Sequence, residues 1–79
     1  MNIAIVDYKM FSSSYVSILG QTDPLTLISS NVAELVPEVI DFCLKNNSKE
    51  ILVAAPIQIV IKIKELIHET YPDWEVKGI

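Results

Sequence analysis

Two short hydrophobic runs without polar alternation predict strands whose two faces are both covered. They are residues 3–6, Ile-Ala-Ile-Val, and residues 51–55, Ile-Leu-Val-Ala-Ala. Such strands lie in the middle of a sheet, because a strand with one face in water alternates between apolar and polar side chains. Residues 74–77 show that alternation, which is typical of a strand at the edge of a sheet.

A first helix is predicted from residue 31 to residue 45. Asn31 followed by Glu34 resembles a capping box, in which each side chain bonds a free backbone N–H of the first turn. Pro37 lacks an N–H, so we expect it to kink this helix or delay its start. Hydrophobic residues repeat at helical spacing along one face: Val32, Leu35, Val36, Val39, Ile40 and Cys43.

A second helix is predicted from Pro56, a residue suited to a first helical position, through about residue 70. Residues 57–64 alone alternate like a strand, but the longer segment has one continuous helical face. That face consists of Ile59, Val60, Ile63, Leu66, Ile67 and Tyr71. With the strands before and after it, this helix makes residues 50–78 a right-handed βαβ unit.

The segment between the first strand and the first helix has two interpretations. Residues 15–19 and 25–28 are β-prone and a turn separates them, so we favour two further strands in a three-strand meander. The competing interpretation makes residues 10–19 a helix. Its apolar face would hold Phe11, Tyr15, Ile18 and Leu19.

The favoured element order is therefore β-β-β-α-β-α-β, a mixed sheet with two helices in one small α/β domain over residues 1–79. The alternative order, β-α-β-α-β-α-β, resembles the flavodoxin-like parallel sheet.

The composition indicates a binding partner. Hydrophobic residues make up 51% of the 79 residues, with only two glycines. A domain of this size has a small core, so the apolar excess favours a protein partner or a homodimer. The net charge is −4 and every basic residue is a lysine, scattered along the chain. Without arginine or a basic stripe, the charges argue against nucleic-acid binding.

Three further features bear on the setting of the protein. The longest apolar run, residues 51–57, is far shorter than the about 18 to 20 residues of a membrane span. A single cysteine, Cys43, permits no internal disulfide, and no basic segment precedes an apolar one near residue 1, so we expect a cytoplasmic protein. Lysine without arginine fits an AT-rich coding bias that is common in phages, and a phage-encoded protein is our hypothesis.

Asp7 follows the first predicted strand, where open α/β sheets place their ligands. In the favoured order the chain resembles the ribonuclease H-like fold, whose first strand carries a metal-binding aspartate. That resemblance implies a nucleic-acid enzyme that uses Asp7 with Mg²⁺ or Mn²⁺. Such enzymes need further carboxylates on the first helix and at the end of the fourth strand. Here that strand ends in Ala54-Ala55, and the acids of the first helix lie opposite its apolar face.

Residues 3–10, Ile-Ala-Ile-Val-Asp-Tyr-Lys-Met, also resemble the start of class I glutamine amidotransferases. That family reads Asp-Tyr-Gly-Met-Gly-Asn, so Lys9, Phe11 and Ser12 depart from it. Its catalytic part is missing, because Cys43 lacks the flanking glycines of a nucleophile elbow and no His-Glu pair follows. We therefore expect no transamidation, and we expect Cys43 to be a buried structural residue.

Two surface features are candidate interaction sites. The acids Glu34, Glu38 and Asp41 share one side of the first helix, as a solvated face or as a contact for a basic partner. On the second helix, Ile57 and Ile61 fall outside the main apolar arc. They lie beside Lys64 and His68, and they predict either a contact site or the edge of the core.

The sequence therefore favours a non-enzymatic protein-interaction or regulatory module without a cofactor. Its partner would be another protein or a second copy of the chain. His68 has no cysteine or second histidine at metal spacing, which argues against a zinc site. The alternative is a reduced ribonuclease H-like, metal-dependent enzyme that uses Asp7.

Overall fold

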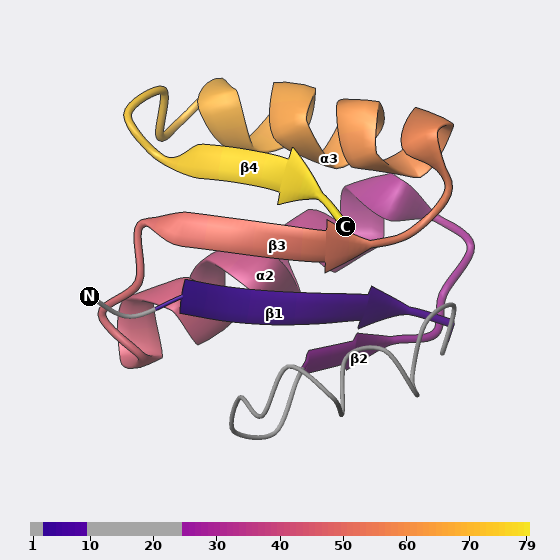
Figure 1. Cartoon of the computed structure of the whole chain (residues 1–79), viewed down its shortest axis with the longest axis horizontal. Helices are drawn as coiled ribbons and strands as arrows, with labels where there is room; N and C mark the ends of the chain where they lie inside the picture. Colours follow the sequence, from indigo (N-terminus) through magenta and orange to yellow (C-terminus); the bar gives the residue numbers. More distant parts are fainter. Residues whose placement is uncertain (1–2, 10–24) are drawn as a thin grey trace.

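The computed structural model describes residues 3–9 and 25–79. These residues form four strands and two helices (Figure 1). In chain order they are β1 (Ile3–Tyr8), β2 (Leu25–Leu27), α2 (Val32–Lys45), β3 (Glu50–Ala54), α3 (Ile57–His68) and β4 (Glu75–Gly78). The favoured interpretation of residues 10–19 as a strand, and its helical alternative, lie outside the described residues.

The four strands are all parallel, in the order β2-β1-β3-β4. The expected α/β class is confirmed. The expected mixed sheet is wrong, because β1 and β2 pair in parallel with Val6 opposite Leu25, whereas a meander requires antiparallel neighbours. Residues 9–24 connect β1 to β2. A connection of this length is long enough for β2 to start at the same end of the sheet as β1 and run parallel to it. A parallel sheet was our alternative expectation.

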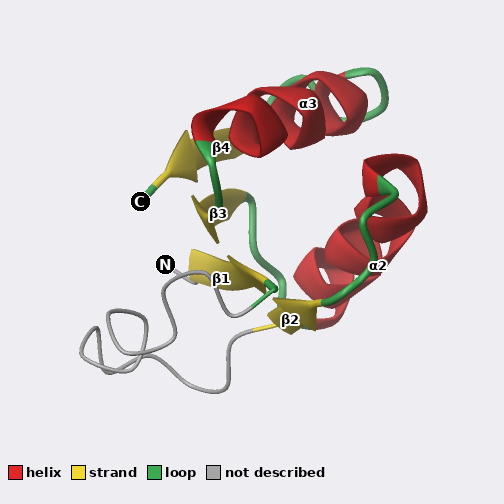
Figure 2. Ribbon diagram, turned by 90° about the vertical axis from the view of Figure 1, so that its right-hand side faces the viewer, coloured by secondary structure: helices red, strands yellow, loops and turns green. Residues whose placement is uncertain are grey.

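Both helices lie on the same face of the sheet (Figure 2). Side chains of a strand alternate between its two faces, and in β1 Ala4, Val6 and Tyr8 join the core under the helices. Ile5 points to the other face and forms a second buried cluster with Ala54. Burial on both faces is therefore confirmed for β1, whereas in β3 Ala54 is buried and Leu52 is half-buried on the face away from the helices. The largest fully buried side chains are Leu27, Ile51, Ile63, Ile67, Val6, Val39, Val53 and Cys43.

Helix α2 begins after the predicted cap residue Asn31, but only half of the expected capping box forms, because the Asn31 N–H donates to the Ser29 hydroxyl at 3.1 Å and not to Glu34. The Asn31 side chain accepts a hydrogen bond from the N–H of Ala33 at 3.1 Å, which satisfies one free donor of the first turn. Pro37 does not delay the helix, which begins at Val32 and continues through the proline to Lys45. The exposed position of Pro37 keeps its ring out of the core.

Helix α3 follows β3 after Pro56, and its carboxyl end leads into β4. Its apolar face buries Val60, Ile63 and Ile67, so the helical pattern overrides the strand-like alternation of its first residues. The βαβ unit predicted for residues 50–78 is confirmed, with Ile51 of β3 opposite Val76 of β4. Neither described helix is both long and apolar enough to cross a membrane.

Candidate functional site

Asp7 lies near the carboxyl end of β1, beside Thr26 of β2 and Ala54 of β3. Its residue is only 2% exposed, so its carboxyl group sits at the sheet and not in open solvent. No three histidine, cysteine or acidic side chains gather within metal-binding reach among residues 3–9 and 25–79. The described part of the chain therefore builds no three-residue metal site around Asp7.

Lys9 ties the end of β1 to the loop before α2. Its N–H donates to the carbonyl oxygen of Leu27 at 2.6 Å, and its ammonium donates to the Ser30 hydroxyl at 2.5 Å. The same ammonium lies 5.5 Å from the centre of the Tyr8 ring. Lys9 has a φ of 52°, a left-handed conformation that favours glycine. The contacts of Lys9 with Leu27, Ser30 and Tyr8 stabilise this backbone conformation at a residue that is not glycine.

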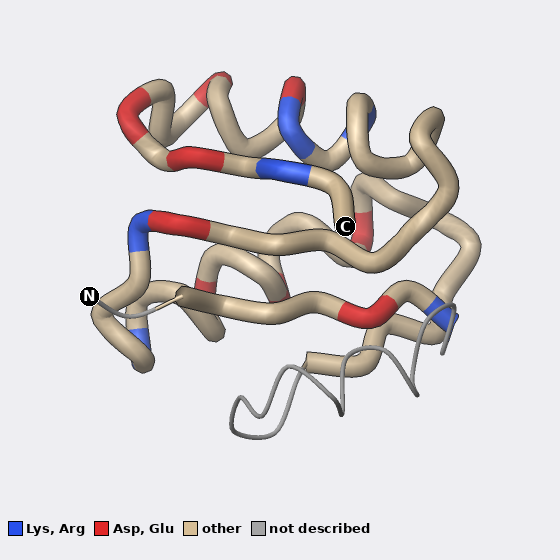
Figure 3. The backbone as a smooth tube through the Cα atoms, in the orientation of Figure 1, with Lys and Arg blue, Asp and Glu red and all other residues tan. Residues whose placement is uncertain are grey.

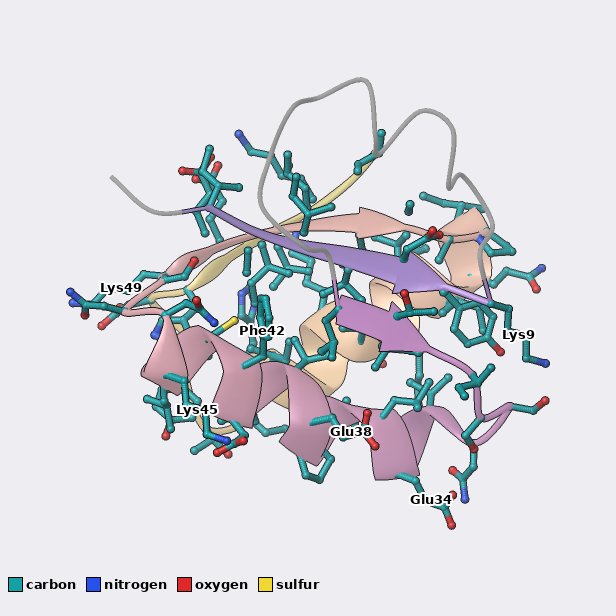
Figure 4. All side chains as sticks on the ribbon, turned by 90° about the horizontal axis from the view of Figure 1, so that it is seen from below. Lys9, Glu34, Glu38, Phe42, Lys45 and Lys49 are labelled. Atoms are coloured by element: carbon teal, nitrogen blue, oxygen red, sulfur yellow. The ribbon has the colours of Figure 1, made fainter. Side chains whose placement is uncertain are left out.

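The acidic face predicted on α2 is exposed as expected. Glu34 and Glu38 are exposed on α2, where Figure 4 labels them, and Asp41 is exposed on the same helix. Asp41 forms an ion pair with Lys45 one turn later, at 3.1 Å, and both side chains are largely in solvent. Exposed pairs of this kind contribute about 0.5 kcal/mol or less. These contacts are those of an ordinary solvated helix face.

The predicted interaction residues of α3 form one stripe along the helix. Ile57, Ile61, Lys64 and His68 fall within about 60° of helical arc. Ile57 is 68% exposed and Ile61 is 51% exposed, so neither belongs to the core. Both side chains are therefore exposed, and their role as a contact site stays a prediction.

His68 lies at the end of this stripe and is half-buried. Its Nε2 donates a hydrogen bond to the carbonyl oxygen of Trp74 at 2.6 Å, which ties the end of α3 to the residue before β4. The Trp74 ring stacks on the Tyr71 ring with their centres 4.1 Å apart. Sequence reasoning placed Trp74 in an edge strand but missed this contact with His68, because it depends on the shape of the turn between them.

A hollow of about 440 Å³ opens between α3 and β4. Lys64 and His68 line it from the helix, and residues 73–77 line it from the strand side. We call this hollow the α3–β4 groove. The groove borders the stripe of α3 at Lys64 and His68, while Ile57 and Ile61 lie outside its lining.

Cys43 is fully buried on the inner face of α2. Burial raises the pKa of its thiol to about 11, because the charged thiolate would lose its hydration. A thiol of this kind is protonated at neutral pH and is a poor nucleophile. The expected structural position of Cys43 in the core is confirmed.

The chain has no significant match among protein-family models, curated proteins or solved structures.

Proposed function

We propose that this chain is a non-enzymatic protein-interaction module that binds its partner through the outer side of α3. The observation that carries the proposal is the exposure of Ile57 and Ile61, which are 68% and 51% accessible on a helix that buries Val60, Ile63 and Ile67 on its inner face. Full burial of an aliphatic side chain is worth about 1.5 to 3 kcal/mol. Two neighbouring isoleucines therefore supply the apolar centre of a small interface.

The surroundings of the two isoleucines support this proposal. Lys64 continues the stripe with a charge, and the α3–β4 groove lies next to it. Interfaces commonly combine an apolar centre with a polar rim, and here Lys64 and the acids Asp73 and Glu75 provide that rim. A protein surface carrying both charges around an apolar strip suits such a site better than a nucleic acid does.

The proposed module acts in the cytoplasm and needs no cofactor. The partner is a protein, either a larger one that this chain regulates or a second copy. A phage-encoded regulator of a host protein is one setting in which a small domain of this kind would act.

The proposal is tested by affinity capture with the double variant Ile57→Ser and Ile61→Ser. We expect the variant to lose at least about 90% of the bound partner, because two exposed apolar anchors are removed. Leu44→Ser is the matched control, since Leu44 is 57% exposed but lies at the end of α2. If the double variant and the control retain the partner equally, the proposed surface is wrong.

A further inference from the structure

We propose that two copies of this chain associate through β4, in an antiparallel pairing centred on Val76 that joins the two parallel sheets into one. This inference rests on the proposed function and names its partner as a second copy. It is carried by the edge position of β4, by the direction of its backbone groups and by the order of its charges.

Strand β4 lies at one end of the described strand order, and β3 is its neighbour there (Figure 1). The N–H of Glu75 donates to the carbonyl oxygen of Lys49 at 2.8 Å, and the N–H of Ile79 donates to that of Val53 at 3.0 Å. Backbone groups of a strand alternate in direction, so Val76 and Gly78 point their N–H and C=O groups away from β3. These groups form a template for another strand.

The charges of β4 select one register. Its sequence is Glu-Val-Lys-Gly, and an acidic and a basic residue flank Val76 (Figure 3). A two-fold axis through Val76 places Glu75 opposite Lys77 of the partner subunit, twice by symmetry. An axis through Glu75 would face two glutamates, and an axis through Lys77 would face two lysines. Opposite charges directly across a strand pair stabilise it and like charges destabilise it, so of these three registers the one centred on Val76 is favoured.

The two charged side chains are well placed for this pairing. Glu75 and Lys77 are about half exposed, at 53% and 54%, on the face of the sheet away from the helices. They already form an ion pair at 2.7 Å within one chain. The hydrogen bond that Lys77 donates to the Glu75 carboxylate raises the pKa of Lys77, with a further contribution from the charges of Glu75 and Glu50. A second copy would extend this pair to four alternating charges.

Backbone geometry agrees with the charges. Val76 points its N–H and C=O outward, so a pair of Val76 residues on the axis exchanges two hydrogen bonds. In an antiparallel ladder the residues on either side of such a pair have closer side chains. Those positions hold Glu75 and Lys77, so the opposite charges fall where side chains lie nearest.

Helix α3 adds an apolar contact to the strand pairing. It lies along β4 on the inner face, since a Cβ added to Gly78 would lie 3.5 Å from the Val60 side chain and His68 bonds Trp74 at the other end. Figure 2 shows α3 at the β4 end of the sheet. Pairing of β4 therefore brings both α3 helices to the same face beside the axis, where the exposed Ile57 and Ile61 of each copy become covered.

The experiment is sedimentation equilibrium over a concentration series with the wild-type chain, Lys77→Glu, and the charge swap Glu75→Lys with Lys77→Glu. We expect reversible dimers for the wild type, about tenfold weaker association for Lys77→Glu, and recovery to within about threefold for the swap. Both side chains are half exposed, so the variants keep the fold, which circular dichroism checks. A wild type that stays monomeric, or a swap that fails to restore association, overturns the inference.

A second readout separates this inference from the proposed function. In the dimer, hydrogen exchange at the Val76 amide slows as the concentration rises, whereas pairing through another surface leaves it unchanged. If the wild type stays monomeric but captures a partner that the Ile57→Ser and Ile61→Ser variant loses, only the homodimer is wrong. If that double variant changes neither capture nor self-association, the proposed function itself is wrong.

Discussion

The His68 Nε2 atom donates a hydrogen bond to the carbonyl oxygen of Trp74 across 2.6 Å, which links the last turn of α3 to the start of β4. Trp74 is also held by its stack on Tyr71 and is only 7% exposed. One side of the α3–β4 groove is therefore rigid where the edge strand begins. The proposed interface is built next to this fixed point.

Replacing His68 by alanine is expected to lower the free energy of unfolding by about 0.5 to 1.5 kcal/mol, because the Trp74 carbonyl loses its donor. Urea unfolding of the variant and the wild type measures this difference. His68→Gln is the conservative comparison, since its amide can donate to the same carbonyl. Equal stability of all three proteins would show that this hydrogen bond does not hold the turn.

Two isoleucines of α3 that lie two residues apart should lose very different amounts of stability when they are truncated to alanine. Ile63 is fully buried, so Ile63→Ala is expected to cost about 2 to 5 kcal/mol through lost burial and the cavity left behind. Ile61 is half exposed, and Ile61→Ala should change stability by no more than about 0.5 kcal/mol. Thermal or urea unfolding compares them. Similar losses at both positions would contradict the placement of Ile61 on the outer side of the helix.

Several of these features follow from the residues alone. Residues 3–6 and 51–55 are apolar at every position. This pattern predicts central strands, because a central strand packs against other residues on both faces. The alternation at residues 74–77 likewise indicated the edge. The direction of β2 did not follow, because three residues, Leu25–Leu27, carry no information on whether a neighbour is parallel.

The candidate site was predicted only in part. The stripe of Ile57, Ile61, Lys64 and His68 follows from helical spacing, and its exposure became clear only when the helix was seen against the sheet. The bond from His68 to Trp74 had no sequence signal, since it depends on how residues 69–73 turn. The outward direction of the Val76 backbone depends on the register with β3, which the sequence does not encode locally.

The thiol of Cys43 gives a prediction for alkaline pH. Burial raises its pKa from 9.0 to about 11, so the unfolded chain loses this proton at a lower pH than the folded chain does. The thiol's contribution to stability is therefore fully present below about pH 9 and falls as the pH rises toward 11. The free energy of unfolding, measured with urea over this pH range, should fall more steeply with pH for the wild type than for Cys43→Ala. Parallel profiles in this range would contradict the raised pKa.

Asp7 gives a prediction about metal ions. The described residues bring no cluster of further acids to it, and the proposed function uses no metal. An amide NMR spectrum titrated with Mn²⁺ should therefore show diffuse broadening or none. Broadening concentrated around Asp7 and residues 54–56 would instead favour the metal-dependent enzyme, and nuclease assays with Asp7→Asn as control would follow.

The most direct test of the proposed interface is amide NMR of the wild-type chain over a dilution series, repeated with the captured partner if there is one. We predict that the amide chemical shifts of Ile57, Ile61 and residues 76–78 change, while those of Glu34 and Glu38 stay constant. Changes confined to the acidic face of α2, or no changes with concentration or partner, would contradict a binding surface at α3 and β4.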